Sequence, residues 1–383
     1  MISASKKSFP SLFTITKYCF GEGSVTVDLP EYAVHRFDQP LPKKATATKS
    51  ELMKYYHQFQ VLRRMEIACD NLYKNREIRG FCHLYDGQEA IAVGIEAATT
   101  FEDCLITAYR DHCQQRLRGD TTHQVIAELM GKRTGSTLGR GGSMHLYRKK
   151  NNFYGGHGIV GAQVPLGVGL AFALKYLNKP NVAIAMYGDG AANQGQISEV
   201  ANIAGLQKLP CIFVCENNKY GMGTSINRAA HNTNFYTRGD LIPGLRIDGQ
   251  NVLHVRETVK LAKEYAIKNG PIFLEMETYR YHGHSMSDPG ISYRTRDEVS
   301  NMRKTKDCID YVRGLLLNNN LATEQELKEI DKAAKEECDQ AVEQARNDPL
   351  PNEDDHLENV YINNTQHWIR GIEYTQSGYP KKQ

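Results

Sequence analysis

Two apolar runs, each followed by a polar cluster, constrain the fold of this chain more than any other feature of its sequence. NVAIAMY at 181–187 leads into the tripeptide GDG at 188–190, and PCIFVC at 210–215 leads into the pair NN at 217–218. Continuous apolar runs of this length are typical of strands that are buried on both faces of a parallel sheet. The intervening QGQISEVANIAGLQK, at 194–208, has the length and pattern of a crossover helix. The stretch therefore predicts one right-handed strand–helix–strand unit.

The two polar clusters predict a ligand site at one edge of that sheet. Ligands of open α/β sheets bind at the carboxyl ends of the strands, so we expect Asp189 and Asn218 to converge although 29 positions separate them. A carboxylate, an amide oxygen and a nearby main-chain carbonyl form a hard oxygen site that suits Mg²⁺ and leaves room for phosphate and water. Gly188 and Gly190 would let the backbone approach a diphosphate closely. Either cluster alone would more often be a simple turn.

Similar apolar runs alternate with helical patterns from about residue 50 to residue 300. This alternation predicts an α/β fold, mainly a parallel sheet with helices on both faces, in a domain at 49–320. A proline-containing extended arm is expected at 28–48 before it. The segment 321–383 is expected to be helical and then to end in a tail, because Thr323 and Glu326 form a capping box.

Composition excludes several classes of partner. The formal charge of +3, from 47 basic and 44 acidic residues among 383, comes without a long run of like charge, which argues against nucleic acid. No run of 18 apolar residues occurs, which argues against membrane insertion. The nine cysteines have no metal-site spacing and are read as reduced, packed thiols.

The amino-terminal segment favours organelle targeting. Its first 21 residues hold three Lys and four Ser but no Asp or Glu, as transit peptides do. We therefore expect an organelle transit peptide at 1–27. An ordinary frayed terminus is the alternative, because the segment has no Arg and Pro10 would interrupt an amphipathic helix.

Longer motifs narrow the function. The GDG…NN pattern resembles the fingerprint of enzymes that use thiamine diphosphate. Together with it, five motifs resemble the alpha subunits of the pyruvate dehydrogenase E1 component: RGFCHLYDGQEA at 79–90, LITAYRDH at 105–112, GRGGSMHLY at 139–147, NFYGGHGIVGAQVPLG at 152–167 and YRYHGHSMSDPGISYRTR at 279–296. The sequence departs from the family pattern by an extra pair of residues around Lys149–Asn151. The resemblance implies the thiamine diphosphate-binding fold and a location in the mitochondrial matrix.

The resemblance also implies roles for individual residues. Asp189, Asn218 and the carbonyl of Tyr220 would hold Mg²⁺. His83 would face the reacting centre and His284 would contact the diphosphate region, where an imidazole can exchange protons near neutral pH. The residues that the resemblance places at the cofactor are His83, Tyr109, Arg110, Gly158, Val160, Asp189, Gly190, Ala191, Asn218, Tyr220 and His284.

The activity implied is the thiamine diphosphate-dependent oxidative decarboxylation of pyruvate, with transfer of the acetyl group to the lipoyl group of the E2 acetyltransferase. No glutamate here matches the one that activates the cofactor, which in this family comes from a beta subunit. An alpha2-beta2 heterotetramer is therefore expected. Three serines, Ser225, Ser285 and Ser292, match phosphorylation sites of the family, which implies a regulatory kinase and phosphatase.

Other interpretations stay open at this point. A branched-chain 2-oxo acid or acetoin dehydrogenase alpha subunit shares GDG…NN, and a cofactor-binding regulatory subunit without catalysis is a different class. A simple nucleotide-binding fold is disfavoured, because no G-x-G-x-x-G directly follows the first predicted strand of the domain. The pair His282 and His284 could bind zinc, but it has no Cys or Asp partner at ligand spacing.

Overall fold

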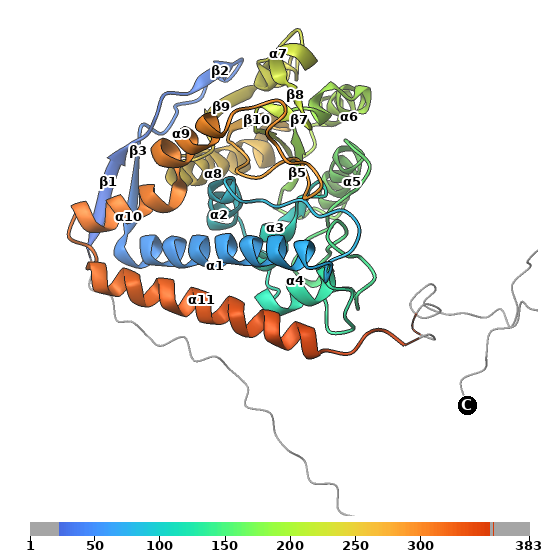
Figure 1. The fold of residues 1–383 in the computed structure, drawn as a ribbon. Helices are drawn as coiled ribbons and strands as arrows, with labels where there is room; N and C mark the ends of the chain where they lie inside the picture. The colour runs from blue at the N-terminus through green and yellow to red at the C-terminus, as the bar shows by residue number, and fades with distance from the viewer. Residues whose placement is uncertain (1–22, 353–354, 356–383) are drawn as a thin grey trace, which may run out of the picture.

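A six-stranded sheet lies at the centre of the structure, a computed structural model that describes residues 23–352 and 355 (Figure 1). Its strand order is β2-β9-β10-β6-β5-β4, and only the edge strand β2 is antiparallel to its neighbour. The α/β fold with a mainly parallel sheet is therefore confirmed. The strands are β2 (Ala33–His35), β4 (Cys104–Ile106), β5 (Ala183–Gly188), β6 (Cys211–Asn217), β9 (Gly244–Asp248) and β10 (Ile272–Glu277).

The predicted strand–helix–strand unit is present as β5, α6 (Gly195–Leu206) and β6. β5 pairs with β6 in parallel, in a register that sets Gly188 opposite Glu216. Every residue of β6 is buried, as expected of a strand covered on both faces. The register brings the residues that follow both strands to the same edge of the sheet.

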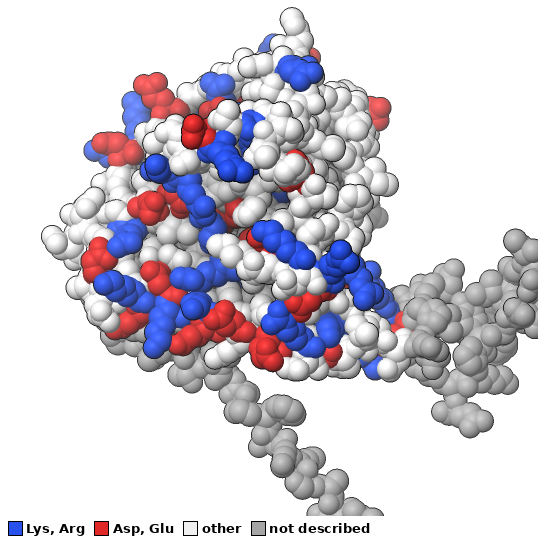
Figure 2. Space-filling view, in the orientation of Figure 1, with Lys and Arg blue, Asp and Glu red and all other residues white. Residues whose placement is uncertain are grey.

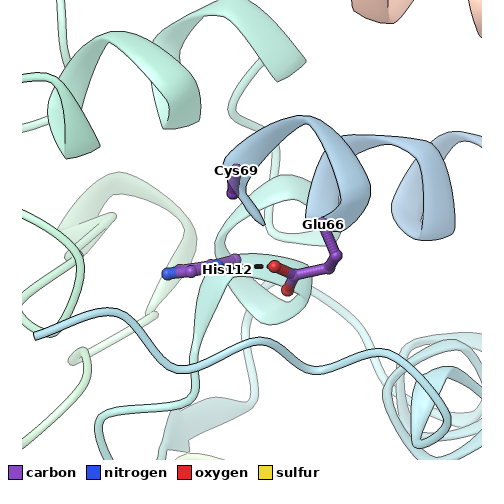
Figure 3. A group of neighbouring side chains, drawn as sticks. All are labelled: Glu66, Cys69 and His112. Atoms are coloured by element: carbon purple, nitrogen blue, oxygen red, sulfur yellow. Dashed lines mark hydrogen bonds and ion pairs between the residues drawn. The ribbon is translucent and has the colours of Figure 1, made fainter. Parts of the chain in front are cut away.

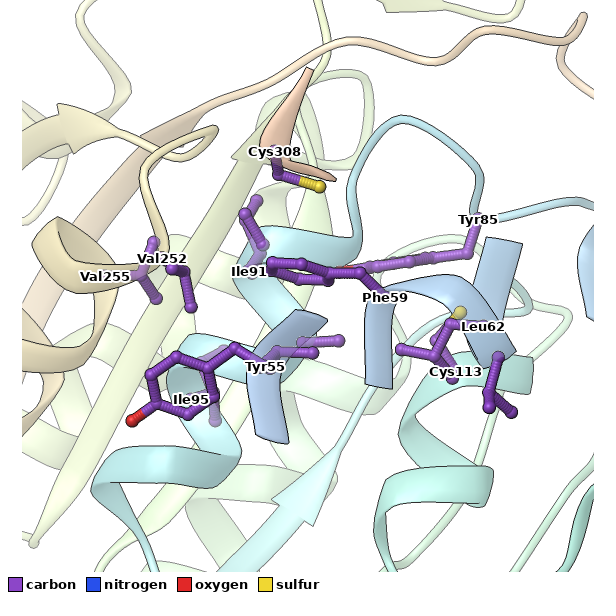
Figure 4. Close-up of a cluster of buried hydrophobic side chains, with 14 of the residues drawn as sticks. Tyr55, Phe59, Leu62, Tyr85, Ile91, Ile95, Cys113, Val252, Val255 and Cys308 are labelled. Carbon is purple, nitrogen blue, oxygen red and sulfur yellow. The ribbon is translucent and has the colours of Figure 1, made fainter. Parts of the chain in front are cut away.

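Helices cover both faces of the sheet, as predicted. On one face lie α2 (Glu89–Ala98) and α8 (Val252–Asn269), which pack against each other and against α1 (Lys49–Lys74). Figure 4 shows this core, including Tyr55, Ile91 and Val255. A Cβ on Gly94 would lie 2.6 Å from the Cβ of Val255, so the close approach of α2 and α8 requires glycine there. On the other face, α5 (Gln163–Tyr176) and α6 enclose a second core.

The helical C-terminal segment packs along α1. Its helix, α11 (Glu324–Asn347), begins at the predicted capping box of Thr323 and Glu326. It runs side by side with α1 and in the same direction (Figure 1). Near the start of both helices the Tyr56 hydroxyl donates to Asp331 over 2.9 Å, and near their ends Arg346 binds Glu77. The helix therefore extends the core of the α/β domain.

The expected arm contains short strands. β1 (Ser24–Asp28) pairs antiparallel with β3 (Lys44–Thr48), and β2 pairs with β9 at the edge of the main sheet. Residues 24–27 of the expected targeting segment thus belong to β1, and residues 1–22 lie outside the described residues. The division of the chain at 27, 48 and 320 stays a prediction.

The remaining helices and strands are short, apart from α9 and α10. Among the described residues, no helix combines the length and apolar character that crossing a bilayer requires. The eight cysteines of the described residues are all free and buried, as expected of packed thiols. These remaining elements are α3 (His112–Leu117), α4 (Thr122–Leu129), α7 (Ile226–Ala229), α9 (Arg296–Lys306), α10 (Cys308–Asn318), β7 (Tyr220–Gly221), β8 (Thr224–Ser225), and the 3-10 turns η1 (Lys149–Asn151), η2 (Ala191–Asn193) and η3 (Phe235–Thr237).

Candidate functional site

Three oxygen atoms converge where β5 and β6 end. The side-chain oxygen of Asn218 lies 3.3 Å from Oδ1 of Asp189 and 3.1 Å from the carbonyl oxygen of Tyr220. Around Mg²⁺, adjacent ligand oxygens at 2.1 Å from the ion are about 3 Å apart, so the spacing suits this cation. If the side-chain amide of Asn218 is rotated by 180°, its nitrogen donates hydrogen bonds to Oδ1 of Asp189 and to the carbonyl of Tyr220. The hydrogen-bonding needs of the cluster are then also met without a cation.

The side-chain amide of Gln88 lies on the other side of Asn218. Nδ2 of Asn218 donates to Oε1 of Gln88 over 3.0 Å, which leaves Oδ1 on the side of Asp189. The other carboxylate oxygen of Asp189, Oδ2, is buried and has no hydrogen-bond partner among the described residues. Burial raises the pKa of Asp189 to about 6, because the carboxylate has lost most of its hydration. A cation beside it would offset this desolvation, so these residues fit a bound Mg²⁺.

Arg280 ties the oxygen cluster to the loop that follows β10. Its guanidinium donates to Oδ1 of Asn218 over 3.3 Å, and to the carbonyl oxygens of Tyr220 and Met222 over 3.1 Å each. The side chain is buried, and desolvation together with the charge of Arg110 lowers its pKa to about 10. Arg280 therefore fixes the two main-chain carbonyls and links them to the loop that follows β10.

The turn after Asp189 is tightly packed, and a side chain from another segment, Arg238, binds it. A Cβ on Gly190 would lie 3.2 Å from Cα of Gly221, so the two backbones cross closely. The next residue, Ala191, starts η2 and is buried. Arg238 holds this turn, because one of its nitrogens donates to the carbonyl of Ala192 and to Oδ1 of Asn193, each over 2.8 Å. Gly190 and Ala191 thus belong to a tightly packed turn next to Asp189, and their contact with the cofactor stays a prediction.

A second cluster brings three rings together from three separate segments. His83 precedes α2, Tyr109 follows β4 and His284 follows β10. The ring centroids are 4.3 Å apart for His83 and Tyr109, 5.2 Å for His83 and His284, and 5.6 Å for Tyr109 and His284. The structure therefore unites these three predicted residues, although sequence spacing alone does not show that they meet.

Both histidines of this cluster are neutral at physiological pH. Burial, with the charge of Arg110 as the next cause, lowers the pKa of His83 to about 2 and that of His284 to about 3. Nδ1 of His83 is buried and has no partner within the described part of the chain. The positive charge of Arg280 contributes to the lowered pKa of both histidines, and it offsets part of the burial effect on the pKa of Asp189. The ring cluster and the oxygen cluster are therefore electrostatic neighbours.

Arg110 serves the backbone in this structure. Its guanidinium donates to the carbonyl of Leu84 and, over 2.8 Å, to the carbonyl of His284. It thereby joins the segment that carries His83 to the loop that carries His284. Its predicted contact with a diphosphate stays a prediction.

The loop that carries Gly158 and Val160 lies on the surface, beside the start of α6. Ile159 is 75% exposed, and the carbonyl of Val160 accepts a hydrogen bond from Gln196 of α6 over 3.4 Å. The loop is therefore linked to the helix that follows the Asp189 turn. Upstream, the extra residues at Lys149–Asn151 form the 3-10 turn η1, so the departure from the family pattern is absorbed locally.

Asp288 organises the loop that holds two of the predicted phosphorylation sites. Its carboxylate accepts hydrogen bonds from the amides of His284 and Gly290 and from the hydroxyl of Tyr293. Ser285 is buried there, and its hydroxyl lies 2.9 Å from that of Ser287. The positions of the three predicted serines differ: Ser285 is buried, Ser292 is exposed, and Ser225 is half-buried at the N-cap of α7.

Sequence reasoning missed two polar residues near the site. Gln88 binds the side-chain amide of Asn218, although nothing in its local pattern marks it. Glu216 lies in the buried strand β6, one residue before the NN pair, and accepts a hydrogen bond from the hydroxyl of Tyr85. Burial raises the pKa of Glu216 to about 7. The sequence signal that could have revealed Glu216 is a carboxylate inside an otherwise apolar strand.

A buried group of Glu66, Cys69 and His112 has the residue types of a metal site (Figure 3). Its polar atoms are already occupied: Nδ1 of His112 lies 2.8 Å from Oε2 of Glu66, and Oε1 of Glu66 accepts the amide of Tyr85. Nε2 of His112 lies 2.8 Å from the hydroxyl of Ser143. Burial keeps the Cys69 thiol protonated, because its pKa is well above the usual value. The group is therefore a hydrogen-bonded support for the segment next to His83.

Oxygen ligands at the carboxyl edge of a parallel sheet, with two neutral histidines nearby, agree with the class of enzymes that the sequence motifs resemble. The family described as "Dehydrogenase E1 component" matches residues 57–354, and the chain belongs to that family, whose members use thiamine diphosphate. Three relatives are similar over most of their length. "Pyruvate dehydrogenase E1 component subunit alpha, mitochondrial" of Pisum sativum is 54% identical over 357 residues, which cover 92% of this chain and 90% of the relative.

Relatives from other organisms are also named as alpha subunits of the pyruvate dehydrogenase E1 component. Subunit alpha-1 of Arabidopsis thaliana is 52% identical over 339 residues, which cover 88% of this chain and 87% of the relative. The somatic form of Bos taurus is 51% identical over 347 residues, which cover 90% and 88%. The resemblance drawn from the sequence motifs and the mitochondrial location are thereby confirmed.

Proposed function

We propose that this chain is the alpha subunit of a pyruvate dehydrogenase E1 component. With a beta subunit it catalyses the thiamine diphosphate-dependent oxidative decarboxylation of pyruvate and passes the acetyl group to the lipoyl group of the E2 acetyltransferase. In the overall complex the products are acetyl-CoA and CO₂. The observation that carries the proposal is the convergence of Asp189, Asn218 and the Tyr220 carbonyl in a chain that belongs to the E1 family.

The oxygen cluster would hold Mg²⁺ and through it the diphosphate of the cofactor. Asp189 supplies the negative charge, while the amide of Asn218 and the carbonyl of Tyr220 supply neutral oxygens. Gly190 and Ala191 would face the phosphates with main chain, since the turn has no room for a larger side chain at 190. When bound, thiamine diphosphate supplies the electron sink that makes decarboxylation possible. The protein's task is to fix the orientation of the cofactor and to control protons.

The histidines act as neutral groups. An imidazole with a lowered pKa donates one N–H without carrying charge, and it can accept a proton when an anion develops beside it. His83, whose Nδ1 has no hydrogen-bond partner within the described residues, would serve the reacting centre. His284 would contact the diphosphate region together with Tyr109 and Arg110. Gly158 and Val160 would approach the aminopyrimidine ring with their backbone.

The partner supported is the E1 beta subunit, in an alpha2-beta2 heterotetramer. The loop with Gly158 and Val160 is exposed, so one side of the cofactor position is open in this chain. Beside it, α5 and α6 present an exposed apolar surface that is larger than isolated surface residues require. Coverage by a beta subunit would bury this surface and would supply the missing glutamate. Its large side chains are Leu166, Phe172, Tyr176, Leu177, Ile203 and Leu206.

Regulation by a kinase and a phosphatase is part of the proposal. A phosphate on Ser285 would bring about two negative charges next to His284 and would disturb the hydrogen bonds that Asp288 makes. Because Ser285 is buried, the loop must open before a kinase reaches it. Ser292 and Ser225 are the other proposed sites. The proposed layout of the chain is a transit peptide at 1–27, an arm at 28–48, the cofactor domain at 49–320 and the helical segment with its tail at 321–383.

The test is a comparison of substrates by the reconstituted heterotetramer. The chain is mixed with its beta subunit, thiamine diphosphate, Mg²⁺ and ferricyanide as the electron acceptor. CO₂ release is measured with pyruvate and with branched 2-oxo acids, and acetaldehyde release is measured with acetoin. A strong preference for pyruvate is expected. Preference for a branched acid or for acetoin would reassign the subunit, and no turnover with any of them would favour a regulatory cofactor-binding subunit.

A further inference from the structure

A positively charged groove lies where α1 ends, next to the loop that carries His284. Its volume is about 460 Å³. One wall is the turn that follows α1, and the other is Met286 of the loop. The amide of Met286 donates to the carbonyl of Cys82 over 2.9 Å, so the two walls are joined beside the ring cluster. The groove is lined by Tyr73, Lys74, Arg76, Ile78, Arg79, Gly80 and Met286.

The charge of the groove is not neutralised by its surroundings. The two nearby acids have partners already: Asp70 binds Lys74 over 2.7 Å, and Glu77 binds Arg346 over 2.8 Å. Arg76 and Arg79 are exposed and form no ion pair within the described residues. Figure 2 shows both signs of charge interspersed over the face in view, so neutralised pairs are the common case on this molecule. The groove therefore keeps two positive charges in excess.

The turn that presents these charges is fixed. Arg76 has a φ of 62°, a left-handed conformation that is unusual for a residue other than glycine. Its amide donates to the carbonyl of Tyr73 over 2.9 Å, and the buried Ile78 anchors the chain two residues later. A partner therefore meets backbone that is already ordered, which lowers the entropy cost of docking.

An exposed aromatic side chain connects the groove to the site. Phe81 is 63% exposed, and its ring stacks over that of His83 with centroids 6.2 Å apart. An exposed aromatic residue next to arginines has the composition of a protein-binding hot spot. A molecule seated on Arg76, Arg79 and Phe81 would thus be within reach of the reacting centre.

We propose that this basic groove docks an acidic face of the acceptor domain that carries the lipoyl group. The inference rests on the proposed function, because it names the surface at which that acceptor meets this subunit. An acceptor domain must arrive and leave in every turnover, and complementary charge speeds its arrival without requiring a tight complex. Docking would also give a function to the two arginines, which form no ion pair within the described residues.

The test uses the alpha2-beta2 heterotetramer and two acceptors. The double variant R76E/R79E reverses the groove charge and changes no residue of the cofactor site. A control, K332E/K335E, reverses two exposed charges in the middle of α11, in the part of this helix that packs along the first half of α1, away from the groove. Each protein is assayed with isolated lipoyl domain and, separately, with ferricyanide as a small oxidant.

The expected result is a rise of about tenfold in KM for the lipoyl domain with R76E/R79E, which shrinks as salt is added. The ferricyanide rate should stay at the wild-type level, and K332E/K335E should behave as wild type. An unchanged KM, an equal rise in the control, or loss of the heterotetramer on size-exclusion would each overturn the proposal; the last would assign the groove to the beta subunit. If the wild-type heterotetramer fails to oxidise pyruvate even with ferricyanide, the proposed function fails instead.

Discussion

Arg238 offers a quantitative test of how the turn at 190–193, here called the cofactor turn, is held in place. Its guanidinium makes three hydrogen bonds: to the carbonyl of Ala192, to the side chain of Asn193 and, over 2.6 Å, to the carbonyl of Asn232. It also lies over the ring of Phe235, with 4.6 Å from the guanidinium carbon to the ring centroid. The truncation Arg238→Ala removes all of these contacts and touches none of the proposed metal ligands.

The magnitude follows from the two bonds to the turn. A hydrogen bond to a charged group contributes about 1.5–3 kcal/mol, so we assign about 2 kcal/mol to the order that Arg238 gives the turn. If the cofactor must restore that order when it binds, its affinity falls about thirtyfold, since about 1.4 kcal/mol corresponds to tenfold. Arg238→Lys keeps the charge but loses the fork, and an intermediate loss is expected.

The assay is isothermal titration calorimetry, in which the heterotetramer is titrated with thiamine diphosphate at saturating Mg²⁺ and the affinity is measured. Arg246→Ala is the matched control, because Arg246 also lies over an aromatic ring, that of Tyr236, and donates to Asn234, but within the described residues it makes no hydrogen bond to the turn. Its affinity for the cofactor should equal that of the wild type. A folded Arg238→Ala variant that binds the cofactor with wild-type affinity would refute this role.

Three further outcomes follow from burial, charge and space. Because burial holds the pKa of Asp189 at about 6, its ionised fraction falls from about 0.9 at pH 7 to about 0.1 at pH 5. In the absence of cofactor, Mn²⁺ should therefore bind about tenfold more weakly at pH 5 than at pH 7. The variant Asp189→Asn should abolish this pH dependence. Glu89→Gln leaves the buried Arg63 with only part of its charge compensation and should cost about 3 kcal/mol in the free energy of unfolding, measured in urea. Gly94→Ala should cost about 1–3 kcal/mol in the same measurement, because the new Cβ would press on Val255 of α8; an unchanged midpoint would contradict the close packing of α2 and α8.

The central strand–helix–strand unit could be predicted because its information is local. The apolar runs of β5 and β6, the helical pattern between them and the capping box at Thr323 each lie within one stretch of sequence. The rule that parallel strands end at the same edge then suffices to bring Asp189 and Asn218 together. Resemblance to the family added His83 and His284, which local pattern does not distinguish from other loop histidines.

The remaining parts of the site depend on contacts that no local pattern encodes. Gln88 reaches Asn218 from the start of α2, and Arg238 reaches the cofactor turn from the loop before β9. Arg110 binds the main chain of two other segments, and its position is set by their packing. The strand β2 is equally hidden, because three residues are too few to show an alternating pattern and only pairing with β9 defines it.

The most direct test of the central claim compares pyruvate decarboxylation by the chain alone, by the beta subunit alone and by the two mixed, each with thiamine diphosphate and Mg²⁺. This chain is proposed to supply the diphosphate-binding half of an active site, so CO₂ release should appear only in the mixture. The same mixture made with Asp189→Asn should be inactive while its heterotetramer still forms. Full activity of this chain without a partner, or of the Asp189→Asn mixture, would contradict the account.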